Sequence, residues 1–182
     1  MGAIEQHGMF VGAALLCAVV ASVSDVREGR IPNGLTSAAM LAGLALHTAV
    51  GGGRGLANSA GAAVLAGCVF ALCYFAGGMG AGDVKLMAAV GCLAGMPAVG
   101  TVLIASAVAG GAFGLALSMV RGRLRETLHN TGLLLLHHQR HGLTPHPQLN
   151  VADGTGLKIP FALPIAAGCL FAFWSAVWGG HS

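Results

Sequence analysis

Six apolar segments divide this 182-residue chain and constrain its fold more than any other feature. They cover residues 8–23, 34–50, 56–77, 84–96, 98–120 and 159–178. A membrane-spanning helix needs about 20 predominantly apolar residues. Only 8% of the residues are charged, against about a quarter in an ordinary soluble domain, so charged side chains cannot cover a water-soluble globule of this size. We therefore predict an all-α polytopic membrane protein, with one domain over residues 1–182 and six transmembrane helices.

The distribution of Lys and Arg predicts how these helices are oriented. With the N-terminus outside, the loops on the opposite side hold Arg27, Arg30, Lys85, Arg121, Arg123, Arg125, Arg140 and Lys158. The outer loops then hold only Arg54. Because loops rich in Lys and Arg stay in the cytoplasm, we predict that both termini are periplasmic and that a polar loop over about 121–158 is cytoplasmic.

Charge and cysteine usage argue against several classes of partner. The net charge is only +3, and the basic residues form no patch interleaved with aromatic residues, so we expect no nucleic-acid partner. The five cysteines lie inside apolar segments and form no CxxC pair. Histidines gather in the long loop, at His129, His137, His138, His141 and His146, but no HExxH motif accompanies them. We expect neither a metal nor a cofactor.

Two of the three aspartates, Asp25 and Asp83, lie where a predicted helix meets the cytoplasmic face. Ionisable residues at such positions are costly and are functional candidates by default. The structural alternatives are an interfacial carboxylate paired with Arg27 or Arg30 for Asp25, and a helix N-cap for Asp83. Asp83 ends the sequence Gly80-Ala81-Gly82-Asp83, in which the glycines let an extended peptide backbone approach closely.

The segment 84–96 is short for a membrane span. Its 13 residues would rise roughly 20 Å as a helix, against a hydrocarbon core of about 30 Å. If Met96 reaches the outer face, Asp83 lies below the inner surface. Irregular glycine-rich backbone at that depth must line a water-filled cavity or be buried in protein.

Three segments resemble the signatures of the type IV prepilin peptidases. Residues 24–33, SDVREGRIPN, are similar to the first signature, an Asp followed by a basic residue and Ile-Pro-Asn. Residues 80–86, GAGDVKL, resemble the second, GxGD with a Lys. Residues 158–165, KIPFALPI, are similar to the closing proline-rich element.

The resemblance implies an intramembrane aspartic protease of the GxGD type, with Asp25 and Asp83 as the catalytic pair. Such enzymes remove a short basic leader from pilin-like precursors at the cytoplasmic face. Further site residues are then expected to shape the loops around the pair: Arg27, Pro32, Asn33, Gly80, Gly82 and Lys85. We also expect Glu28 to hold basic residues of the leader, the alternative being a surface ion pair with Arg27 or Arg30.

The resemblance also separates two branches of the family. The bifunctional members methylate the new N-terminus and carry a region with paired cysteines between the first two spans. Here residues 24–33 alone separate those spans, and no CxxC is present. The chain is most similar to the short branch that serves tight-adherence (Flp-type) pili, which implies peptidase activity alone, in a bacterial inner membrane.

In the mechanism that we expect, two carboxylates and a water hydrolyse a peptide bond. Two nearby carboxylates in a low-dielectric site cannot both ionise easily, so the pair shares a proton. The main alternative is a small proton-coupled transporter with Asp25 and Asp83 as relay groups. Transporters often carry internal repeats, and none stands out here. A purely structural membrane subunit is the third possibility; the substrate and the oligomeric state stay open.

Overall fold

A computed structural model describes residues 3–76, 79–122, 125, 129 and 160–178. Within these residues all regular structure is helical, which confirms the all-α part of the prediction. The principal helices are α1 (Ala3–Glu28), α2 (Asn33–Phe75), α3 (Ala81–Ala94), α4 (Met96–Val120) and α6 (Ala162–Trp178). Almost all of the loop 121–158 lies outside the described residues.

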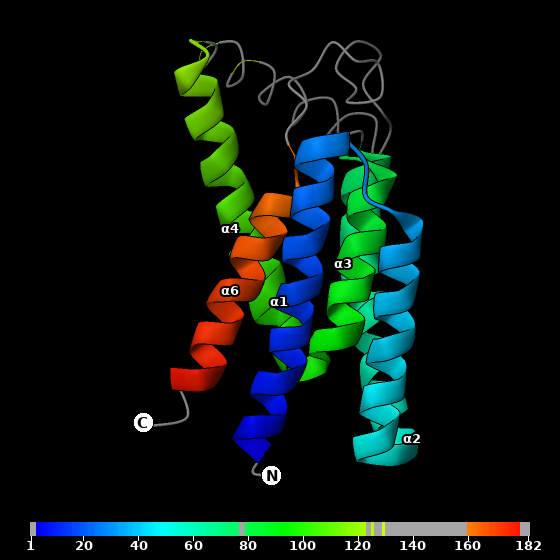
Figure 1. The fold of residues 1–182 in the computed structure, drawn as a ribbon. Helices are drawn as coiled ribbons and strands as arrows, with labels where there is room; N and C mark the ends of the chain where they lie inside the picture. Colours follow the sequence, from blue (N-terminus) through cyan, green and yellow to red (C-terminus); the bar gives the residue numbers. More distant parts are fainter. Residues whose placement is uncertain (1–2, 77–78, 123–124, 126–128, 130–159, 179–182) are drawn as a thin grey trace.

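Helix α2 reverses direction within its 43 residues, at Gly52. Gly52 has φ 56° and ψ −140°, a conformation that favours glycine because a Cβ would clash with the backbone. Beyond the reversal the chain returns so closely that a Cβ on Gly55 would overlap the carbonyl oxygen of His47. The two arms, residues 33–51 and 53–75, contain the second and most of the third predicted apolar segments, and Figure 1 shows the turn at the lower end of the bundle.

Helix α3 lies between the two arms of α2 and contacts both through small residues. A Cβ on Gly43 of the first arm would lie 2.9 Å from the Cys92 backbone. A Cβ on Gly91 would lie 2.7 Å from the carbonyl oxygen of Ala62 in the second arm. In a membrane the hydrophobic effect does not drive helices together, so close van der Waals packing has to stabilise their contacts. Small residues make this possible because they let helix backbones approach closely.

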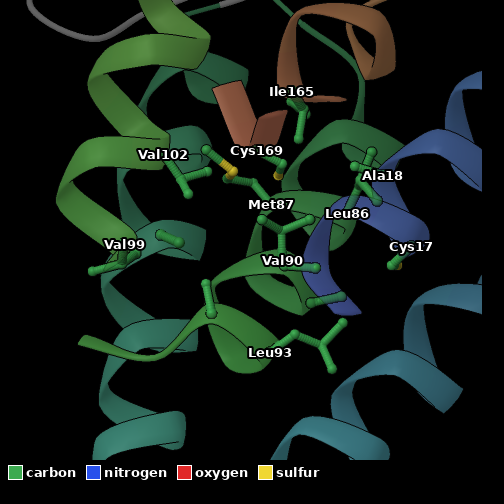
Figure 2. Packing of buried hydrophobic residues seen from close by; sticks show 14 of the residues in the cluster. Cys17, Ala18, Leu86, Met87, Val90, Leu93, Val99, Val102, Ile165 and Cys169 are labelled. Atoms are coloured by element: carbon green, nitrogen blue, oxygen red, sulfur yellow. The ribbon is translucent and has the colours of Figure 1, made fainter. Parts of the chain in front are cut away.

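The other side of α3 faces the remaining helices. Helix α6 packs against α1 and α4, and α1 packs against α3. The core between them is apolar and is shown in Figure 2. Its labelled residues are Cys17, Ala18, Leu86, Met87, Val90, Leu93, Val99, Val102, Ile165 and Cys169.

Three described helices are long and apolar enough to cross a membrane: Gln6–Glu28, Asn33–Phe75 and Met96–Val120. Helix α6 is apolar but has only 17 residues. Large apolar side chains point outward from the bundle; Leu16 is 70% exposed and Ile104 is 69% exposed. The membrane-helix character is confirmed, but six separate transmembrane helices are not clearly present in the described residues, because two predicted segments are joined in α2 and α3 has 14 residues.

At the end opposite Asp83, α3 stops before it reaches the level of the α2 turn. Met96, just after α3, donates its backbone N–H to Asn58, which lies six residues (58 − 52) beyond the reversal at Gly52. Six helical residues correspond to about 9 Å. In Figure 1, α3 begins level with the end of α1 and stops short of the α2 turn. Met96 itself is 47% exposed, and the recessed position of Asp83 in the membrane stays a prediction.

Candidate active site

Asp25 occupies the last turn of α1, where the chain is about to leave the helix. The helix ends at Glu28, and Gly29 adopts φ 63° while donating its N–H to the Asp25 carbonyl oxygen at 2.9 Å. A glycine with positive φ is a common helix terminator, since it accepts the left-handed conformation without steric cost. The Asp25 side chain is half-buried at this position.

Asp83 occupies the first turn of α3. The helix begins at Ala81, so Asp83 is its third residue, and the N-cap interpretation of Asp83 is wrong because Gly80 holds that position. The Gly80 N–H donates to Asp83 Oδ2 at 3.1 Å, and the Asp83 N–H donates to the Gly80 carbonyl oxygen at 3.1 Å. The carboxylate is half-buried and lies where the helix dipole favours negative charge.

The fold brings the two aspartates to the same end of the bundle. Helices α1 and α3 pack against each other, and the charge of Asp25 acts on Asp83. In Figure 1 the end of α1 and the start of α3 lie at the same level.

The short link between α1 and α2, residues 29–32, lies within the first signature segment. Ile31 in this link and Asn33 just after it contact the second signature segment, residues 80–86. Pro32 precedes α2 in an extended conformation, φ −62° and ψ 128°. Asn33 Oδ1 accepts a hydrogen bond from Lys85 Nζ at 3.0 Å, although 52 residues separate them. Gly82 lies against Ile31, whose Cδ1 would be 3.6 Å from a Cβ on Gly82. The link therefore rests on the first turn of α3, beside Asp83.

Several residues near the two aspartates, most of them charged, are exposed to the surroundings of the bundle. Arg27, Glu28 and Arg30 are exposed at the end of α1, and Gly80 is exposed before α3. The structure brings these residues to the end of the bundle that carries Asp25 and Asp83, but nothing in it tests their individual roles. Those roles stay predictions.

The proline-rich closing element contributes to packing in the described part. Pro164 and Ile165 are buried in α6, and a Cβ on Gly110 of α4 would lie 3.6 Å from Pro164. Residues 158–159 and four of the five loop histidines lie outside the described residues. Within the described ranges, no group of three or more His, Cys, Asp or Glu is arranged to hold a metal ion.

Three polar residues at the opposite end of α3 were not predicted as functional from the sequence: His47 and Ser59, which are buried, and Asn58, which is half-buried. Their signal was present, because polar side chains inside apolar membrane segments are costly and need partners. Their partners, in contrast, were not visible, since they are backbone atoms more than 30 residues away in the chain.

Comparison with known proteins identifies the family. The model of the type IV leader peptidase family matches residues 12–115, a stretch that contains both aspartates and ends before α6. The prepilin leader peptidase/N-methyltransferases of Burkholderia pseudomallei strains 1026b and K96243 are each 35% identical over 128 residues, which cover 63% of this chain. The matched region spans 40% of the length of these curated relatives. No solved structure matches the chain. Since the family model covers more than half of the sequence, the chain belongs to the type IV leader peptidase family.

Proposed function

We propose that this protein is an aspartic endopeptidase that removes the basic leader peptide from prepilin-like precursors at the cytoplasmic face of the membrane. The observation that carries the proposal is the position of Asp25 and Asp83 at the same end of the bundle, on two helices that pack together and each within one of the two signature segments. Membership of the family supports the peptidase reaction.

The proposed reaction uses a water held between the two carboxyl groups. One carboxylate, ionised, takes a proton from the water, and the other, protonated, donates to the carbonyl oxygen of the scissile bond. The tetrahedral intermediate then collapses, and the leaving amine takes up a proton from the pair. Asp83 Oδ2 already accepts the Gly80 N–H, so Oδ1 is the oxygen that we assign to the water.

We place the end of the bundle that carries the aspartates on the cytoplasmic side. Arg27, Arg30 and Lys85 gather at that end, whereas Arg54 lies two residues beyond the Gly52 reversal at the other. In this arrangement each arm of α2 crosses the membrane once, α3 forms the fourth segment, and both termini are periplasmic. This orientation follows the positive-inside rule and corresponds to a bacterial inner membrane protein.

We further propose that the protein is a peptidase without methyltransferase activity, as in the branch that serves Flp-type pili. Only residues 29–32 separate α1 from α2, so no cysteine-containing region is inserted there. The exposed Glu28 beside Asp25 is the acidic group that we assign to leader Lys or Arg residues.

Cleavage of a purified prepilin-like precursor in detergent tests the proposal. Asp25→Asn and Asp83→Asn should each lower the cleavage rate by about 10²–10⁴-fold, because each removes one partner in proton transfer. Both variants should insert and accumulate normally, and Asp153→Asn should cleave like the wild type. Full activity in a well-inserted Asp25→Asn or Asp83→Asn protein would end the aspartic-protease interpretation. Mass spectrometry of the product should show a free N-terminal amine.

A further inference from the structure

The junction between α3 and α4 breaks the helical hydrogen-bond pattern inside the bundle. Helix α3 ends at Ala94, Gly95 adopts φ 75° and ψ 172°, and α4 begins at Met96. Residues 91–95 are all buried, whereas Met96 and Pro97 at the start of α4 are exposed. The last carbonyl groups of a helix and the first N–H groups of the next have no intrahelical partner, so a buried junction must find partners elsewhere.

Three side chains of α2 supply those partners. His47 Nε2 lies 3.0 Å from the Leu93 carbonyl oxygen, and because that oxygen can only accept, the ring nitrogen donates. Ser59 Oγ donates to the Cys92 carbonyl oxygen at 2.7 Å. Asn58 Oδ1 accepts the Met96 N–H at 3.2 Å. We call His47, Asn58 and Ser59 the junction clasp; they come from both arms of α2, on either side of Gly52.

The clasp is held in place by its surroundings. His47 is 5% exposed and Ser59 is fully buried. The His47 ring stacks on Phe10 of α1, with centroids 3.9 Å apart and planes at 18°. On the α3–α4 side, a Cβ on Gly95 would lie 2.7 Å from His47 Cε1, so the ring also lies tightly against the junction. The imidazole therefore has little freedom to move away from Leu93.

The opposite end of α3 is attached more weakly. The hydrogen bond from Lys85 to Asn33 is exposed, and Gly82 makes only ordinary van der Waals contact with Ile31. Asp83 lies 11 residues (94 − 83) before the end of α3 on one continuous helix. A displacement of the helix along its axis at the junction therefore moves Asp83 by the same distance.

We propose that the junction clasp positions α3 along its axis and so sets where Asp83 meets Asp25. His47, Asn58 and Ser59 are positioning residues: they contact neither substrate nor the aspartates and act through the helix. The inference rests on the proposed peptidase function, in which a small misplacement of a reacting group lowers the rate strongly. It makes two separable claims, one about the junction itself and one about catalysis.

The native cysteines test the claim about the junction without any activity. Cys92 lies beside the clasp and is 1% exposed, while Cys169 in α6 is fully buried elsewhere in the core. N-ethylmaleimide labelling followed by peptide mass mapping should show Cys92 at least about tenfold more reactive in His47→Leu than in the wild type. Cys169 should be unchanged, and His47→Gln, whose amide N–H replaces the donor, should restore protection of Cys92.

Steady-state cleavage tests the claim about catalysis. His47→Leu should lower kcat about tenfold, while KM stays within about twofold. We expect a change of this size because the substitution removes one buried hydrogen bond that positions α3. His47→Gln should recover most of kcat. Ser59→Ala and Ser106→Ala make a matched pair, since both remove a buried hydroxyl but Ser106 Oγ has no hydrogen-bond partner. Only Ser59→Ala should lower kcat.

The outcomes separate this inference from the proposed function. Unchanged Cys92 labelling in His47→Leu overturns the clasp, whatever the activity. Faster Cys92 labelling with unchanged kcat also overturns it, because the junction would then have no influence on Asp83. A wild-type protein that cleaves no prepilin defeats the proposed function, while the labelling experiment still decides whether the clasp holds the junction.

Discussion

Helix α3 leaves its first turn exposed at Gly80, Ala81 and Lys85, whereas residues 91–94 at its other end are all buried. The exposed end carries Asp83 and is held by one exposed side-chain hydrogen bond to α2. At the buried end, His47 and Ser59 of α2 donate hydrogen bonds to carbonyl oxygens of α3, Asn58 accepts the exposed N–H of Met96 at the start of α4, and the backbones pack closely. One helix thus joins an exposed end to an anchored end.

The largest expected difference between the two ends concerns glycine-to-alanine substitutions. A Cβ at Gly91 would lie 2.7 Å from the Ala62 carbonyl oxygen, so Gly91→Ala must displace backbone and should lower the free energy of unfolding by about 1–3 kcal/mol. Gly82→Ala meets only Ile31 side-chain atoms at 3.6 Å and should be neutral or stabilising by up to about 1 kcal/mol. Denaturant titration in detergent micelles measures both.

Cleavage activity gives a second comparison between Gly82→Ala and Gly91→Ala. Gly82→Ala should reduce cleavage despite its normal stability, because the added methyl group fills space next to the Gly82 backbone, where we expect the substrate backbone to approach. A Gly91→Ala protein as stable as the wild type would show that the junction end is not closely packed, and the contrast between the ends would fail.

A smaller effect is expected for the contact that ties the exposed end to α2. Lys85→Met removes the hydrogen bond to Asn33 Oδ1, and since the pair is exposed the loss of stability should stay below about 1 kcal/mol. A double-mutant cycle with Asn33→Ala should give a coupling energy of similar size in the unfolding free energy. Coupling well above that range would mean that the exposed end is anchored as firmly as the junction.

The smallest expected effect concerns leader recognition beside the exposed end. Glu28→Gln removes an exposed negative charge and should raise the apparent KM for a basic leader by about twofold to fivefold. The same change should have almost no effect on a leader without Lys or Arg, which serves as the control. Equal effects on both leaders would assign Glu28 to a surface ion pair instead.

Much of the exposed end was predictable because its signals are local. Asp25, Asp83, Asn33 and the glycines beside Asp83 lie in short contiguous motifs. Such motifs can be identified from the sequence without knowledge of distant contacts. The family match confirms that resemblance. The start of α3 at Ala81 was not predicted, because the apolar pattern begins at Val84 and the helix extends three residues before it.

The buried end was not predictable for the opposite reason. His47 and Leu93 are 46 residues apart, and no local pattern links a histidine in one apolar segment to a carbonyl group in another.

By itself, the sequence determined that this is a helical membrane protein of the type IV leader peptidase family, because low charge, apolar segments and short motifs are properties of the chain alone. The tertiary structure decided that α2 folds back at Gly52, that its two arms enclose α3, and that polar side chains from both arms terminate α3 within the bundle. The physical reason is that buried backbone groups at a helix junction must be hydrogen-bonded, and the side chains able to reach them are fixed only when distant segments pack together.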